Sequence, residues 1–216
     1  MNKFIIAVLA LVILSGCGIR VRTYVENYSN LTGVYQGASI AVVGYPPKRN
    51  KSLAWKNHKA FFEKELRRVG FRVTNSEDTE YVAVVSYGID DGTTTSAVVS
   101  SPRYGQTGGG YTTHSGTVSS SSGGFGNYYG SSYTQPNYGV VGTNVSTVTS
   151  TTFKRALTVN IENRKTKKRV FEGTAKSEGS CRNITMVLPY LAESMFKKFP
   201  AGSGKIILPG GEKWNC

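Results

Sequence analysis

The sequence has few of the side chains that enzymes and metal sites most often use. It contains two histidines, His58 and His114, and three cysteines in 216 residues. No Cys-x-x-Cys pair and no cluster of cysteine with histidine occurs, so a zinc or redox role has no support. A G-x-S-x-G nucleophile elbow and an alternating acidic calcium loop are also missing. We therefore predict that the protein is not an enzyme and holds no metal ion or cofactor.

The few titratable candidates favour structural roles. His58 lies in an expected helix among phenylalanines, where a packing or surface role is favoured over ligation, and His114 stands alone in a glycine-rich stretch. The acidic pairs at 77–78 and 90–91 fall at expected turn or strand ends. Solvated turn residues are the favoured interpretation of these pairs, ahead of general acid–base chemistry.

No apolar run is long enough to cross a membrane as a helix. Residues 4–14 are apolar, whereas a membrane-spanning helix needs about 20 such residues. Lys3 precedes this run and small residues follow it, which is the order of a secretory signal peptide. The letters LSGC at 14–17 resemble the lipobox of bacterial lipoproteins, in which the cysteine is lipidated. The alternative is an ordinary signal peptide that contains a cysteine.

The lipobox resemblance implies that residues 1–16 are a signal peptide and that Cys17 becomes the mature N-terminus. Cys17 would carry covalent diacylglycerol and an N-acyl chain such as palmitate, and several chains hold to a membrane where one is marginal. Gly18 stands where an aspartate would usually retain a lipoprotein in the inner membrane. The resemblance thus implies an outer-membrane lipoprotein with most of its chain in the periplasm. Residues 17–38 are then the lipidated N-terminus and a tether.

Acidic residues are half as numerous as basic ones. The 26 lysines and arginines and 13 aspartates and glutamates give a formal net charge of +13. Export argues against a nucleic-acid partner, so anionic lipid, lipopolysaccharide or peptidoglycan are the expected anions. Basic residues cluster along the first expected helix and at a later hairpin turn, with a plain solvated face as the alternative. The candidate anion-binding residues are Lys56, Lys59, Arg67, Arg68, Lys165, Lys167 and Lys168.

Two cysteines remain once Cys17 is assigned to lipid. An exported compartment favours a disulfide between Cys181 and Cys216. Such a bridge would tie the last residue of the sequence to the beginning of the final helical region. The alternative is two free thiols.

Outside the leader, apolar residues follow the periods of strands and helices. Residues 52–70 predict an amphipathic helix that Gly70 ends, and residues 153–179 predict a hairpin. We predict an α+β fold with a mainly antiparallel sheet and two helices packed on one face, in a single domain of residues 39–216. The remaining expected elements are strands at 39–45, 71–75 and 80–90, and a final helix that ends near Phe199 and contains Pro189 in its first turn or at a kink.

Residues 91–150 lack leucine, isoleucine and methionine, and their only charged residues are Asp91 and Arg103. Twelve glycines and six tyrosines occur there, so the segment cannot supply an aliphatic core. Its valine- and threonine-rich ends favour a long hairpin insertion with a Gly/Tyr/Ser-rich tip, and a disordered insertion is the alternative. The glycines at 105–110 follow no clear strand, so a phosphate loop is not supported.

The tyrosines of this segment are interspersed with glycine and serine. Such a composition suits an adaptable interaction surface or self-association, although a simple spacer has the same composition. The candidate interaction residues are Tyr104, Tyr111, Tyr128, Tyr129, Tyr133 and Tyr138.

The arrangement resembles an uncharacterised family of bacterial lipoproteins that is classed only as a domain of unknown function. The resemblance lies in Gly70-Phe71, the apolar strand at 81–87, Phe171-Glu172-Gly173 and the final Phe199-Pro200. The family hairpin usually carries Trp-x-Gly, and Phe171 replaces that tryptophan here. The resemblance implies a small α+β domain that ends in a Phe-Pro helix, and it implies no catalytic residues.

These observations predict an outer-membrane-anchored lipoprotein that is a structural or interaction subunit of a cell-envelope assembly. Its expected partners are the membrane, through the lipid, and other proteins or further copies of the chain. The alternative is a periplasmic binding module for anionic glycan, peptidoglycan or lipopolysaccharide. An envelope hydrolase is a third and weaker hypothesis. The sequence leaves open the identity of the partner, the oligomeric state and whether the domain faces the periplasm or the exterior.

Overall fold

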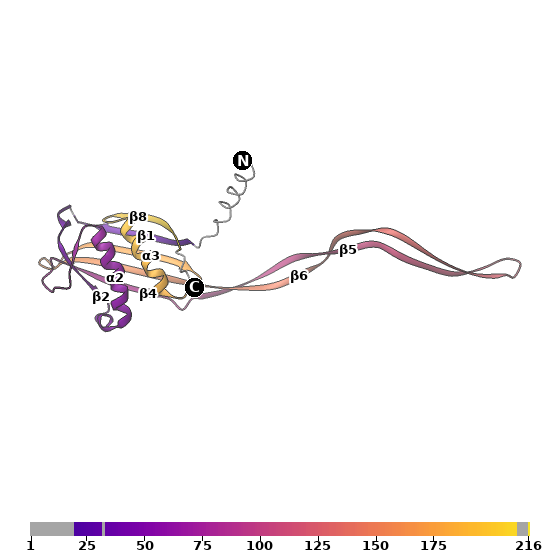
Figure 1. The fold of residues 1–216 in the computed structure, drawn as a ribbon, viewed down its shortest axis with the longest axis horizontal. Coiled ribbons are helices and arrows are strands. Elements are labelled where there is room, and N and C mark those ends of the chain that lie inside the picture. The colour runs from indigo at the N-terminus through magenta and orange to yellow at the C-terminus, as the bar shows by residue number, and fades with distance from the viewer. Residues whose placement is uncertain (1–19, 32, 211–215) are drawn as a thin grey trace, which may run out of the picture. The chain divides into compact units, whose positions relative to one another are not determined.

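The computed structural model describes residues 20–31, 33–210 and 216 (Figure 1). The signal peptide and the lipidated Cys17 that the sequence predicts lie outside these residues. The chain divides into two compact units, of which the first contains Met1–Thr94 and Thr151–Cys216. The second unit is Thr95–Ser150, which falls within the segment that the sequence sets apart as an insertion.

Eight strands form one sheet in the described part of the chain, in the order β3-β2-β4-β6-β7-β1-β8, and β5 pairs with β6 beside this path. The neighbouring strands β6 and β7 pair antiparallel and form the predicted hairpin. The strands are β1 Arg20–Ser29, β2 Ser39–Gly44, β3 Arg72–Val73, β4 Tyr81–Ile89, β5 Thr93–Ser119, β6 Phe125–Asn163, β7 Arg169–Gly179 and β8 Gly202–Pro209.

The sheet is mixed, so the predicted fold class, a mainly antiparallel sheet with two helices packed on one face, is wrong. Strand β2 runs parallel to both of its neighbours, β3 and β4. The physical reason is the connection through the helix α2, Leu53–Arg68, because a strand–helix–strand crossover returns the chain in its original direction. Each helix also contacts its own part of the sheet: α2 contacts β2 and β3, while α3, Ile184–Lys197, contacts β1, β7 and β8.

Residues 20–29, which the sequence analysis assigns to a tether, form β1 between β7 and β8. This is a second correction. Every other side chain of β1 is buried, but two of the four buried residues are Thr23 and Asn27, so the strand lacks a clear apolar alternation. Strand β8 was not predicted either, because Gly202 and Gly204 weaken its strand signal.

The helix predicted at 52–70 is confirmed as α2. The Ser52 side chain caps its start by accepting a hydrogen bond from the Trp55 backbone N–H at 3.0 Å. Gly70 follows its end with φ of +107°, a left-handed conformation that favours glycine. The chain then turns back, with the Phe71 N–H donating to the Leu66 carbonyl at 3.0 Å.

The helices α2 and α3 lie side by side, as Figure 1 shows, and they share one core with the sheet. Helix α3 begins at Ile184, so Pro189 lies inside it rather than in its first turn. The aromatic side chains Phe62, Phe171 and Phe196 are almost fully buried in this core. The largest aliphatic members are Ile40, Leu66, Leu157, Ile161, Leu188, Leu191 and Met195.

Candidate functional site

The second unit, Thr95–Ser150, is a two-stranded ribbon built from β5 and β6, and we call it the ribbon. Its chain reverses between Ser120 and Gly124, where the Ser120 N–H donates to the Gly124 carbonyl at 2.8 Å. Gly123 has φ of +87° in this turn, which explains a glycine at that place. The threonine- and valine-rich arms favour strands because β-branched side chains fit a pleated surface.

Polar side chains bridge the two arms of the ribbon at several points. His114 and Ser132 lie within hydrogen-bond distance at 3.0 Å, and the Thr117 hydroxyl donates to the Asn127 side-chain oxygen at 3.1 Å. The rings of Tyr111 and Tyr133 meet across the arms with their centroids 4.9 Å apart. These contacts hold one arm to the other, but they bury little apolar surface.

All six candidate tyrosines of the ribbon are exposed. The fractional exposure ranges from 51% at Tyr128 to 88% at Tyr129, and Phe125 is 82% exposed. Every residue of the ribbon is exposed or half-buried. A two-stranded hairpin on its own is at best marginally stable, and a large exposed apolar surface indicates an interaction site. The other exposed apolar residues of the ribbon are Val98, Val99, Val118, Val140, Val141, Val145 and Val148.

The ribbon is almost free of charge in a strongly basic chain. Arg103 is its one formally charged residue, whereas the chain as a whole carries +13. Most of the positive charge therefore lies in the first unit. Two uncharged surfaces can approach each other without the repulsion that the rest of the chain would produce.

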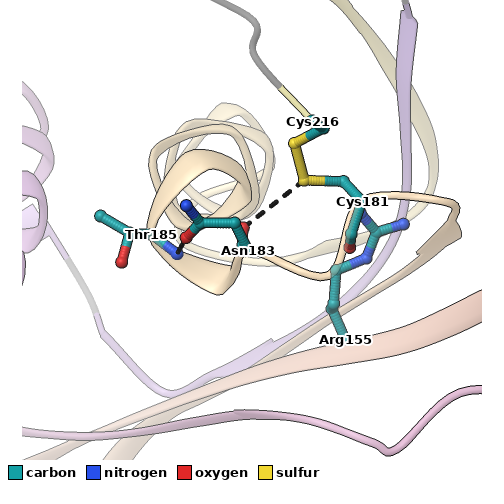
Figure 2. Close-up of a disulfide and its surroundings, with 5 residues drawn as sticks. All are labelled: Arg155, Cys181, Asn183, Thr185 and Cys216. Carbon is teal, nitrogen blue, oxygen red and sulfur yellow. Dashed lines mark hydrogen bonds between the residues drawn. A yellow bond between two sulfur atoms is a disulfide. The ribbon is translucent and has the colours of Figure 1, made fainter.

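The structure joins Cys181 and Cys216 by a disulfide, with their Cα atoms 5.0 Å apart (Figure 2). Cys181 precedes α3, and its sulfur lies 3.6 Å from the Asn183 carbonyl oxygen. Arg155 of β6 donates from Nη1 to the Cys181 carbonyl at 3.5 Å, and burial lowers the pKa of this arginine. The bridge therefore ties Cys216 to the segment between β7 and α3.

The predicted basic residues differ in their surroundings. Arg67 and Arg68 pair with acids of their own helix, with N–O distances of 3.3 Å to Glu63 and 2.7 Å to Glu65. Their charges are therefore partly balanced. The turn between β6 and β7 contains the other candidate lysines, and all three are exposed: Lys165, Lys167 and Lys168.

Lys56 and Lys59 line a hollow of about 720 Å³ beside α2 and β2. Arg164, from the turn after β6, lines the same hollow, although 105 residues separate it from Lys59 in the sequence. In the sequence, Arg164 directly precedes the hairpin lysines, and no local signal brings that turn to α2. The hollow is also lined by Ala41, Val42, Val43, Asn50, Trp55, Asn75, Ser76 and Glu77.

His58 is buried, so of the packing and surface roles predicted for it the packing role holds. Its Nδ1 lies 2.6 Å from the Tyr87 hydroxyl of β4, and its Nε2 lies 3.1 Å from the Thr185 hydroxyl of α3. Burial lowers the pKa of His58, and the nearby positive charge of Arg49 lowers it further. The imidazole consequently stays neutral in the folded protein at neutral pH.

This lowered pKa predicts acid sensitivity. Below about pH 6.5 the imidazole of the unfolded chain binds a proton before that of the folded chain, so stability is present above that pH and is lost as pH falls toward the folded pKa. We expect the urea midpoint to fall between pH 7.5 and pH 5 by less in His58→Gln than in the parent protein. His114→Gln changes an exposed histidine and should leave the full decrease in place. An equal decrease in all three proteins would contradict this role of His58.

Neither a metal site nor a membrane-spanning helix is found in the part of the chain that the structure describes. No group of three or more histidine, cysteine or acidic side chains comes together there. No helix among those residues is both long enough and apolar enough to cross a membrane.

The family model described as Domain of unknown function (DUF4136) matches residues 24–201, and the chain belongs to this family. No curated protein matches the sequence. Among solved structures, a PelC dodecamer from Paraburkholderia phytofirmans shows 13% identity and a TM-score of 0.37, over 82% of this chain and 93% of that chain. A PDZ domain protein from Parabacteroides distasonis shows 9% identity and a TM-score of 0.41, over 92% of this chain and 41% of that chain. These likenesses are too distant to establish a function.

Proposed function

We propose that this protein is a lipid-anchored interaction subunit of a cell-envelope assembly, and that copies of the chain associate through their ribbons. The observation that carries the proposal is the exposure of the tyrosines and valines of Thr95–Ser150. A two-stranded ribbon has no second layer to cover its side chains, so burial of these residues requires a partner.

A second copy of the chain is the partner that fits this surface best. Outside the ribbon the chain is strongly basic, and two copies repel each other there at low salt. The ribbon contains a single formal charge, Arg103, so this repulsion is weakest where two ribbons meet. A two-stranded ribbon also has two edges that offer unpaired backbone groups, and an identical strand can pair with them.

The envelope location is supported by two features of the chain. Residues 14–17 resemble a lipobox, which would place a lipid on Cys17. The disulfide between Cys181 and Cys216 suits an oxidising compartment outside the cytosol. Lipidation would hold the copies on one membrane surface, where their effective concentration is raised.

The test is the molar mass of the mature chain with Cys17→Ser, measured by light scattering after size exclusion. We expect an oligomer for the full chain and a folded monomer when residues 95–148 are replaced by a short Gly-Ser linker. A milder change replaces the six ribbon tyrosines by serine and keeps the length of the ribbon. This variant should also be a folded monomer.

A matched control replaces Tyr24 and Tyr28 of β1, which are also exposed, by serine. These tyrosines belong to the first unit, so this variant should keep the parent molar mass. A monomeric full chain would refute the proposal. An oligomer that persists without the ribbon would show that another surface makes the contact.

A further inference from the structure

The hollow beside α2 combines a recess with cations that come from distant parts of the chain. Lys56 and Lys59 lie on α2, and Arg164 follows β6. The recess exists because β3 pairs only with Ser39 and Ile40, so the edge of β2 that faces away from β4 has no strand partner beyond Ile40 among the described residues. Its volume of about 720 Å³ lies within the usual range of small-molecule sites.

The walls of the hollow are held by specific contacts. Asn50 closes the end at Gly44, because its side chain accepts from the Gly44 N–H at 2.7 Å and donates to the Gly44 carbonyl at 3.0 Å. At the other end, the Arg164 N–H donates to the Glu80 carbonyl at 2.9 Å. Lys59 links α2 to the loop after β3 by donating to the Asn75 side-chain oxygen at 2.6 Å. The recess is therefore built by tertiary contacts rather than by one mobile loop.

Two of the three cations have no acidic partner in the part of the chain that the structure describes. Lys59 lies 3.5 Å from Glu63, but Lys56 and Arg164 make no ion pair within the described residues. The Nε atom of Arg164 is buried and has no hydrogen-bond partner among those residues. A guanidinium that lines a recess and has no acidic partner there is available to bind an anionic group that enters the recess. Glu77 is the single acid that lines the hollow.

The remaining lining residues suit a sugar that carries the negative charge. Asn75 and Ser76 offer an amide and a hydroxyl, which are groups that bind hydroxyls, and Trp55 supplies an aromatic wall. Trp55 and Val42 are buried, so the interior side of the hollow is apolar. Lys165, Lys167 and Lys168 follow Arg164 in the chain and add a positive field near the hollow.

We propose that this hollow binds a sugar bearing a phosphate or a carboxylate, with Lys56 and Arg164 holding the anionic group. The site lies within the first unit and does not depend on association through the ribbon. Lys59 positions the loop that carries Asn75, and Glu77 opposes the ligand charge.

The reporter for the test is the fluorescence of Trp55. The sequence has two tryptophans, so Trp214→Phe leaves Trp55 as the only one. The full chain with Cys17→Ser and Trp214→Phe is titrated with glucose 6-phosphate, glucuronic acid, glucose and inorganic phosphate. We expect saturable binding of at least one of the two anionic sugars, weaker binding at higher salt, and none with glucose. Binding of the first sugar alone identifies phosphate as the recognised group, and binding of glucuronic acid extends recognition to carboxylate.

The variants separate the hollow from the general positive charge. We expect Lys56→Gln and Arg164→Gln each to weaken binding by about tenfold, because each removes a charged hydrogen-bond donor. Arg67→Gln and Arg182→Gln remove the same charge outside the hollow and should change the affinity little. Glu77→Gln should tighten binding, and a gain of affinity cannot result from unfolding.

Three results would overturn the proposal. The first is the absence of binding by both anionic sugars. The second is an equal loss of affinity in the hollow variants and the control variants, which would show a diffuse electrostatic effect. The third is inorganic phosphate binding as tightly as glucose 6-phosphate, because the sugar would then contribute nothing.

Discussion

Replacing Phe171 by alanine is expected to lower the free energy of unfolding by about 3 to 5 kcal/mol, the range for a buried aromatic side chain. Phe171 is 1% exposed, and its ring centroid lies 5.0 Å from that of Phe199. The loss combines the burial that the ring contributes and the cavity that it would leave between β7 and α3. Urea unfolding followed by circular dichroism measures the change.

The position of Phe171 also explains the glycine two residues later. A Cβ atom at Gly173 would lie 2.8 Å from the Phe171 ring and 2.8 Å from the Asn27 side-chain oxygen. Gly173→Ala should therefore destabilise the same region through a steric clash, by about 1 to 3 kcal/mol. Phe125→Ala in the ribbon is the matched control, because Phe125 is exposed and its loss should cost less than about 0.5 kcal/mol. Equal effects of Phe171→Ala and Phe125→Ala would contradict the described core.

Removal of the disulfide is expected to lower the free energy of unfolding by about 2 to 4 kcal/mol. The bridge spans 35 residues, and in the chain-entropy account it restricts the unfolded state over that length. Cys216→Ser is the cleaner change, because Cys216 is exposed whereas Cys181 is 3% exposed and part of the core. Urea unfolding of the oxidised parent and of the variant measures the difference.

A reducing agent provides the control for this second prediction. It should lower the stability of the parent to that of Cys216→Ser and should leave the variant unchanged. If the oxidised parent and Cys216→Ser unfold at the same urea concentration, the bridge contributes no stability. The bridge does not form if the reducing agent leaves the stability of the parent unchanged and oxidation leaves its number of free thiols unchanged.

Local signals were sufficient for several elements. The boundaries of α2 were predictable from Ser52 and Gly70, because a side-chain cap and a left-handed glycine act within a few residues. The hairpin of β6 and β7 was predictable because Leu157, Val159 and Ile161 alternate toward the core. Strand β1 was missed because a buried polar pair, Thr23 and Asn27, replaces apolar residues at half of its inward positions.

The direction of the strands and the members of the hollow required the tertiary structure. The prediction of a mainly antiparallel sheet was wrong because the alternation of side chains along a strand does not indicate which strand it pairs with or in which direction. The parallel pairing of β2 with β3 and β4 follows from the crossover through α2. Likewise, Arg164 reaches the hollow of Lys56 only because β6 and β4 pair over their full inner length.

The sequence by itself determined the family motifs, the boundaries of α2, the two cysteines available for a bridge and the composition of the ribbon. These features depend on neighbouring residues or on composition, and both are present in the chain before it folds. The tertiary structure decided the mixed sheet, the place of β1 between β7 and β8 and the convergence of Lys56, Lys59 and Arg164. Those features depend on pairings between residues far apart in the chain, and the free energy of such pairings comes from burial in a core that the folded protein alone contains.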